Sequence, residues 1–169
     1  MIDLEKAQRV LRLLESHHLT LGAAESLTGG LFAATICSVP GASKVFKGAV
    51  VSYVPSVKED LLGVNAEDIA RYGVVSETVA RAMAEGALKA LHVNLAVSFT
   101  GNAGPTSEPG QAPVGRVNMA IAFVRNNTPM AVYVEEKNFV GERNSIREAS
   151  VNAMMEAILS LQKTIEGHD

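Results

Sequence analysis

Segments with the apolar spacing of an amphipathic helix alternate with short, β-branched segments along this sequence, and no other feature limits the possible folds so strongly. The helical patterns cover residues 3–17, 28–38, 56–62, 66–71, 76–91 and 141–165. The strand patterns cover residues 19–25, 45–54, 93–100, 114–124 and 129–139. This order predicts an α/β protein with helices on both faces of a mixed sheet. We expect the last two strands to form a hairpin through the turn Asn126-Asn127-Thr128.

Polar residues at the helix starts support this division of the chain. Asp3, Ser56 and Ser76 each precede a helical pattern and are expected to be N-caps. Pro55 is expected to end the strand before it, because proline cannot donate a hydrogen bond to a neighbouring strand. The first two strands and the third are therefore predicted to be parallel, since helices cross over between them.

Length and composition indicate one ordered domain over residues 1–169. Hydrophobic residues make up 47% of the 169 residues and charged residues 20%, which is typical of a folded core. The formal net charge of −3 gives no overall attraction to nucleic acid or to an anionic membrane. No apolar stretch reaches the ~18 residues of a membrane-spanning helix, and the N-terminus lacks a signal-peptide pattern. We expect a cytoplasmic protein that binds neither nucleic acid nor membrane, and association into a homo-oligomer is plausible.

Cysteine and histidine usage predicts neither a metal site nor an internal disulfide. Cys37 is the only cysteine and is expected to be a small core residue. His17, His18, His92 and His168 lack the i, i+4 spacing of a helical metal pair and are expected at the surface or at helix ends. No cofactor is expected either.

Small and hydroxyl-bearing residues interrupt the apolar run at Ala23 to Gly30, where the first strand leads into a helix. A helix N-terminus presents unpaired N–H groups and roughly half a unit of positive charge, which favour an anion or an oxyanion. Ser26 would lie in that field as a nucleophile. The same residues also fit a plain structural role, as a capped helix start with glycines for close packing.

Two further features lie beyond the ends of predicted strands, where ligands of α/β sheets gather. Lys58 follows the second strand, and a lysine with a lowered pKa can serve as the base for a serine. The loop 101–113 follows the third strand and contains three glycines and three prolines. Each has an ordinary alternative, because Lys58 can be a solvated helix lysine and the loop a flexible connection.

Several motifs, in order, resemble the C-terminal domain of the CinA competence-damage family, which includes stand-alone nicotinamide mononucleotide deamidases. The Glu-Ser-x-Thr-Gly-Gly and Thr-Gly-x-Ala-Gly-Pro motifs are the most specific, and the similarity covers almost the whole chain. The resembling segments are residues 23–30, 48–58, 72–76, 100–105, 113–115 and 139–143.

The resemblance implies a three-layer α/β/α sandwich with a mixed, mainly parallel central sheet. It also implies hydrolysis of the nicotinamide amide to the acid with release of ammonia, so that a pyridine nucleotide is the expected partner. By motif position the catalytic residues are Ser26, Lys58 and Tyr53. The expected substrate-binding residues are Glu25, Thr28, Gly29, Gly30, Thr100, Gly101, Asn102, Gly104, Arg143 and Arg147. Either arginine can hold a substrate phosphate, because guanidinium matches phosphate geometry, or lie on a helix surface instead.

The sequence departs from the family pattern beside the lysine and in the long loop. Val54 and Pro55 replace residues that are usually polar, and Asn102 replaces an isoleucine. These departures leave a second hypothesis open, namely an inactive paralogue that binds a nucleotide, or an amidase for a different amide.

Overall fold

The computed structural model describes residues 1–126 and 128–167 and has a five-stranded mixed sheet with the order β2-β1-β3-β4-β5. Strand β1 pairs in parallel with β2 and β3, whereas β3–β4 and β4–β5 are antiparallel, so only β4 of these strands runs against the others. The strands are β1 (Leu21–Glu25), β2 (Phe46–Val51), β3 (Leu95–Gly101), β4 (Arg116–Phe123) and β5 (Ala131–Asn138). The predicted mixed, mainly parallel sheet is confirmed.

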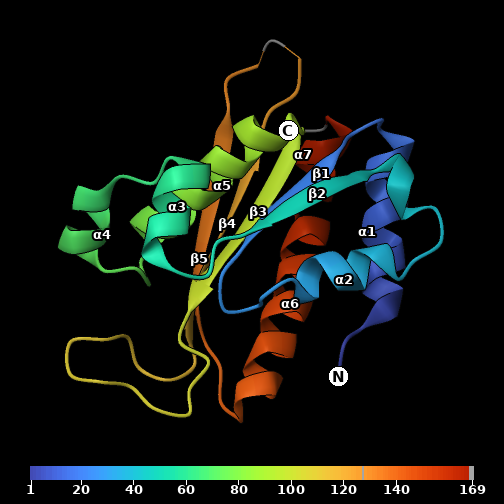
Figure 1. Ribbon diagram of the computed structural model, residues 1–169. Helices are drawn as coiled ribbons and strands as arrows, with labels where there is room; N and C mark the ends of the chain where they lie inside the picture. Colours follow the sequence, from blue (N-terminus) through green and yellow to red (C-terminus); the bar gives the residue numbers. More distant parts are fainter. Residues whose placement is uncertain (127, 168–169) are drawn as a thin grey trace.

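Helices cover both faces of the sheet, as Figure 1 shows. On one face lie α1 (Leu4–Ser16), α2 (Leu31–Cys37), α6 (Arg143–Ser160) and α7 (Gln162–Glu166). On the other lie α3 (Pro55–Leu62), α4 (Ala66–Tyr72) and α5 (Glu77–Leu91), and a 3₁₀ turn spans Ala42–Lys44. The three-layer α/β/α sandwich expected from the resemblance is therefore confirmed.

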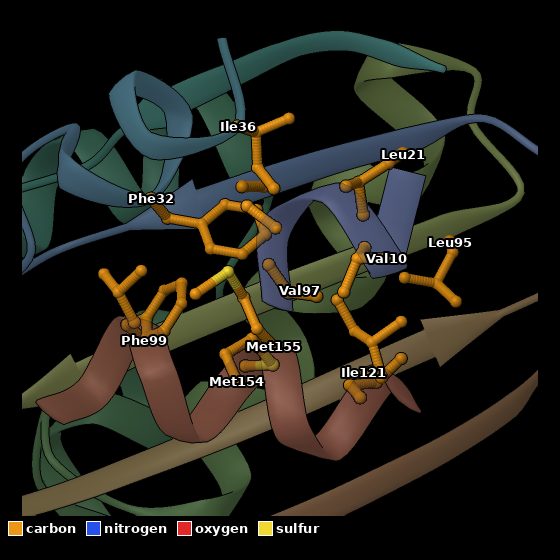
Figure 2. Close-up of a cluster of buried hydrophobic side chains, with 14 of the residues drawn as sticks. Val10, Leu21, Phe32, Ile36, Leu95, Val97, Phe99, Ile121, Met154 and Met155 are labelled. Carbon is orange, nitrogen blue, oxygen red and sulfur yellow. The ribbon is translucent and has the colours of Figure 1, made fainter. Parts of the chain in front are cut away.

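The larger core lies between the sheet and the layer of α1, α2 and α6, shown in Figure 2. The rings of Phe32 and Phe99 lie 5.5 Å apart at its centre, beside the buried side chains of Met154 and Met155. Because Phe32 belongs to the first turn of α2 and Phe99 to β3, this contact fixes the start of α2 against the sheet. The turn at residues 26–30 is therefore held by a packed core at its helical end.

The helix starts agree with the sequence at two positions and differ at a third. Asp3 accepts a hydrogen bond from the N–H of Lys6 at 3.1 Å, and Ser76 Oγ accepts one from Val79 at 3.2 Å. The prediction that Ser56 caps α3 is wrong, since the cap residue is Val54 and the helix begins at Pro55. Proline suits the first helical position, because its fixed φ is helical and its missing N–H would have had no partner there.

Two other predictions need correction, and two fall on residues outside those that the structure describes. Residues 141–165 do not form one helix, because α6 ends at Ser160, whose hydroxyl donates to the carbonyl of Ala157, and α7 begins at Gln162. Cys37 is exposed rather than in the core, because it lies on the outer side of the last turn of α2. Asn127 of the predicted hairpin turn and His168 lie outside the described residues. His17 and His92 lie at helix ends, as expected.

Candidate functional site

A cavity of about 540 Å³ opens where β1, β2 and β3 end, at the edge of the sheet near the start of α6. That volume lies within the range of about 300–1,000 Å³ typical of small-molecule sites. Its lining includes Ser26, Leu27, Tyr53, Pro55, Lys58, Tyr72, Gly73, Val74, Val75, Thr100, Gly101, Asn102, Ala103, Gly110, Gln111, Ala112, Pro113, Arg116 and Arg143. The features that follow three separate strands in the sequence thus share one cavity.

Ser26 and Lys58 are in direct contact. Lys58 Nζ lies 2.9 Å from Ser26 Oγ, although 32 residues separate them in the sequence. The same ammonium donates to the carbonyl oxygens of Ser52 at 2.5 Å and Tyr53 at 3.4 Å. Ser26 Oγ itself donates to the carbonyl of Tyr53 at 3.4 Å. The segment between β2 and α3 therefore positions both side chains through its backbone.

Lys58 is fully buried and has no carboxylate partner among the hydrogen bonds of the described residues. Burial disfavours the charged ammonium and lowers the pKa of Lys58 from 10.5 to about 8. A lysine with such a pKa is partly neutral near pH 7 and can accept a proton from a hydroxyl at hydrogen-bond distance. The arrangement can therefore activate Ser26 as a nucleophile.

Glu25 lies behind the cavity and caps α2. Its carboxylate is fully buried and accepts hydrogen bonds from the N–H groups of Gly30 at 3.1 Å, Phe32 at 3.0 Å and Ala33 at 3.0 Å. These are the orphan donors of the helix N-terminus, which the sequence suggested would attract an anion. The protein's own carboxylate already occupies these three donors.

Arg147, which does not line the cavity, donates hydrogen bonds to the backbone of the turn at residues 26–30. Its Nε donates to the carbonyl of Leu27 at 3.0 Å and its Nη2 to that of Thr28 at 2.8 Å, while Nη1 contacts Asn144 at 3.0 Å. Thr28 is fully buried, and its hydroxyl finds no partner among the described residues. Thr28, Gly29, Gly30 and Arg147 do not line the cavity, and Arg147 holds the turn in place through its two carbonyl contacts.

Tyr53 and Arg143 close one side of the cavity. The Tyr53 ring is 55% exposed, and its hydroxyl accepts a hydrogen bond from Arg143 Nη2 at 2.9 Å. Arg143 Nη1 donates to the carbonyl of Gly104, which itself does not line the cavity. The first residue of α6 thus links the segment after β2 to the loop after β3.

Thr100 and Asn102, which were expected to bind substrate, both line the cavity and hold neighbouring backbone in place. Thr100 Oγ1 donates to the carbonyl of Val74 at 2.7 Å and so holds the α4–α5 connection against the sheet. Asn102 donates to the carbonyls of Thr106 at 3.2 Å and Ala112 at 2.9 Å, and accepts from the N–H of Gly104 at 2.9 Å. Asparagine at this position closes the loop on itself, which an isoleucine cannot do.

Sequence reasoning missed several lining residues. Arg116, the first residue of β4, reaches the cavity, as do Gln111 and the connection Tyr72–Val75. The segment 72–76 and the residues just before Arg116 belong to the motifs that resemble the family, so a signal was present in both places. Strand register was needed to tell which side Arg116 faces.

The part of the chain that the structure describes contains neither a candidate metal site nor a helix that could span a membrane. Within residues 1–126 and 128–167, no three histidine, cysteine or carboxylate side chains gather in a way that could hold a metal ion. Among the same residues, no helix has the length and apolarity needed to cross a membrane.

The family model described as the CinA C-terminal domain matches residues 3–162. A relative from Desulforamulus reducens is 43% identical over 154 residues, which is 90% of this chain and 36% of the relative. A CinA-like protein from Flavobacterium psychrophilum is 42% identical over 147 residues, which is 87% of this chain and 34% of the relative. The chain thus spans about a third of the length of these curated relatives.

Solved structures of the superfamily have the same fold. The crystal structure of a CinA superfamily protein from Klebsiella pneumoniae aligns with a TM-score of 0.89 at 28% identity, over 95% of this chain and 98% of that chain. A competence/damage inducible protein from Agrobacterium tumefaciens aligns with a TM-score of 0.88 at 33% identity, with the same coverage. The sequence match over residues 3–162 and the shared fold together establish that the chain belongs to the CinA C-terminal domain family.

Proposed function

We propose that this domain is an amidase that hydrolyses the carboxamide of nicotinamide mononucleotide, giving nicotinate mononucleotide and ammonia. The observation that carries the proposal is the 2.9 Å contact between Ser26 Oγ and Lys58 Nζ at the wall of the cavity. The lowered pKa of Lys58 supports it, because a base for a serine must be able to exist in its neutral form. The nicotinamide substrate itself comes from the resemblance to the deamidases of the family.

In the first half of the reaction, neutral Lys58 accepts the hydroxyl proton of Ser26 while Ser26 Oγ forms a bond to the carboxamide carbon. The tetrahedral intermediate then collapses, and the bond between that carbon and the amide nitrogen breaks. Protonated Lys58 returns its proton to the leaving nitrogen, which departs as ammonia. An acyl ester on Ser26 remains.

In the second half, water attacks the acyl carbon and gives its proton to Lys58. The ester bond to Ser26 Oγ breaks, and the proton returns to the serine oxygen. The product forms as a pyridine carboxylic acid, which loses its proton to water and leaves as the carboxylate, and neutral Lys58 is restored. Because one lysine serves both halves, its pKa must lie near the working pH, as the value of about 8 allows.

We assign the stabilisation of the oxyanion to two backbone N–H groups. The N–H groups of Leu27 and Ala103 belong to residues that line the cavity, and neither donates a hydrogen bond to any described residue. Leu27 directly follows the proposed nucleophile, a position that commonly supplies an oxyanion donor. The Leu27 N–H shares its peptide plane with the carbonyl of Ser26, which accepts a hydrogen bond from the N–H of Gly29 at 3.0 Å, so this donor is oriented before substrate binds.

Incubation with nicotinamide mononucleotide tests the proposal through the release of ammonia and of nicotinate mononucleotide in equal amounts. We expect Ser26→Ala and Lys58→Ala each to lower kcat by at least about 10³-fold, since either change removes half of the reacting pair. A matched control is Ser38→Ala, at a serine on the end of α2 that does not line the cavity. Equal turnover by the wild type and both dyad variants would refute the proposal.

A further inference from the structure

The charged side chains that line the cavity are all cationic. Lys58, Arg116 and Arg143 contribute to the lining, whereas no aspartate or glutamate does among the described residues. The whole chain has the opposite tendency, with a formal net charge of −3. A cavity with this sign in an acidic protein favours an anionic ligand.

The two arginines differ in what their terminal nitrogens contact. Arg143 Nη2 donates to the Tyr53 hydroxyl and Nη1 to the carbonyl of Gly104, so both terminal nitrogens of its guanidinium already have a partner within the protein. Arg116 is approached only at Nε, by Asn138 Oδ1 at 3.4 Å and Glu136 Oε1 at 3.8 Å. Its Nη1 and Nη2 have no hydrogen-bond partner among the described residues. Nη1 and Nη2 of Arg116 are therefore more available to an anionic ligand than the same atoms of Arg143.

The backbone around Arg116 is fixed before any ligand binds. Its N–H donates to the carbonyl of Pro113 at 3.1 Å, and its carbonyl accepts from the N–H of Asn102 at 3.0 Å. Gly115 has φ +93°, and a Cβ there would lie 1.9 Å from the carbonyl oxygen of Phe139, so only glycine fits. The position of Arg116 is therefore determined by the sheet and by the loop that follows β3.

The carboxylate of Glu136, which does not line the cavity, contacts Arg116 from β5. Glu136 Oε1 also accepts a hydrogen bond from the buried Asn118 amide at 3.3 Å, and it approaches the guanidinium at Nε only. Asn138 and Glu136 thus hold the guanidinium at Nε, and its two terminal N–H₂ groups stay without a hydrogen-bond partner among the described residues. Two parallel N–H donors match two oxygens of a phosphate monoester.

We propose that Arg116 binds the phosphate monoester of the substrate and so selects a mononucleotide over the corresponding nucleoside. The identity of the pyridine base rests on the function proposed above, whereas the recognition of a phosphate by Arg116 does not. Arg116 is then a specificity-determining residue, and Arg143 chiefly orders Tyr53 and the loop.

The test compares nicotinamide mononucleotide with nicotinamide riboside, which lacks the phosphate. For Arg116→Gln we expect kcat/KM for the mononucleotide to fall about 10- to 100-fold, since a bidentate, charge-assisted pair is lost. The value for the riboside should change less than about twofold. Arg116→Lys, which keeps the positive charge but lacks the two parallel N–H donors, should lower kcat/KM for the mononucleotide by an intermediate factor. Arg81→Gln is the matched control, because Arg81 is half exposed on α5 and does not line the cavity.

Calorimetric titration of both ligands separates this inference from the proposed reaction. If the wild type binds the mononucleotide more tightly than the riboside, and Arg116→Gln removes that preference, the inference stands even without any ammonia release. An equal effect of Arg116→Gln on both ligands overturns it, even if deamidation is rapid. A wild type that shows no preference for the phosphate also overturns it. Thermal unfolding of each variant establishes that it is folded under the assay conditions.

Discussion

Lys58 combines two properties that rarely occur together, because it is a cation with a fully buried side chain. Its three hydrogen bonds go to neutral oxygens, which offset only part of the cost of removing an ammonium from water. The lowered pKa expresses that cost. Stability is therefore given up at the residue that we propose as the base, as is common at functional sites.

We predict that Lys58→Met stabilises the fold, and that the gain depends on pH. The pKa of Lys58 is about 8 in the folded state against 10.5 for a free lysine, so below pH 8 protonation favours the unfolded chain. The wild type recovers this loss as pH rises from about 8 toward 10.5. The variant should therefore be more stable by about 1–3 kcal/mol at pH 7, and its advantage should shrink by about 2 kcal/mol at pH 9.5.

Urea denaturation at pH 7 and pH 9.5 measures both free energies of unfolding. Lys44→Met is a suitable control, since the Lys44 side chain is 68% exposed and its ammonium stays in contact with water. An advantage for Lys58→Met that is the same at both pH values would contradict the assignment of the lowered pKa to Lys58.

Individual residues were predictable from the sequence to very different degrees. Ser26 and Lys58 could be paired because each follows a strand end within a motif that resembles the family. The role of Glu25 could not be predicted, because a carboxylate beside a serine in sequence gives no sign that it turns back to cap α2. Arg116 was missed for a similar reason, since the face of β4 on which it lies depends on pairing with Asn138 of β5.

At the scale of elements, α3 determines where Lys58 lies, and α5 determines where α3 lies. Gly86 in the middle of α5 faces the end of α3 so closely that a Cβ would be 2.0 Å from the carbonyl oxygen of Leu62. This contact is with backbone, which cannot move aside as a flexible side chain can. The glycine therefore sets the spacing between the two helices.

Gly86→Ala is predicted to lower stability by about 1–3 kcal/mol, because the added methyl pushes α3 away from α5. Helix propensity alone would have the opposite sign, since alanine is favoured over glycine by about 1 kcal/mol inside a helix. Turnover should fall as well, because α3 would carry Lys58 away from Ser26. Urea denaturation and kcat/KM measure the two effects, and a more stable variant with unchanged turnover would show that the spacing is unimportant.

The order and type of the elements followed from the sequence, whereas several boundaries did not. Ser76 was recognisable as a cap because its side chain and the helix it begins are local in sequence. Pro55 was expected to end the strand, but it also begins α3. The same chemistry, a fixed φ and a missing N–H, suits both roles, and the sequence alone could not choose between them.

At the scale of the whole molecule, the architecture brings together parts of the chain that are distant in sequence. The cavity is built from segments at residues 26–27, 53–58, 72–75, 100–103, 110–116 and 143. The doubly covered sheet makes this possible, because the carboxyl ends of β1, β2 and β3 meet at one edge, as Figure 1 illustrates. The departures from the family pattern at Val54, Pro55 and Asn102 leave this assembly intact, which supports the active amidase over a binding module that has lost its chemistry.

The pH dependence of kcat/KM for nicotinamide mononucleotide tests most directly the central claim, that buried Lys58 is the base for Ser26. Only neutral Lys58 can accept the serine proton, so kcat/KM should rise about tenfold per pH unit below about 8 and level off above it. The residual activity of Lys58→Ala should lack this rise. A profile that is flat between pH 6.5 and pH 8.5 in the wild type, or an unchanged rise in Lys58→Ala, would contradict the account.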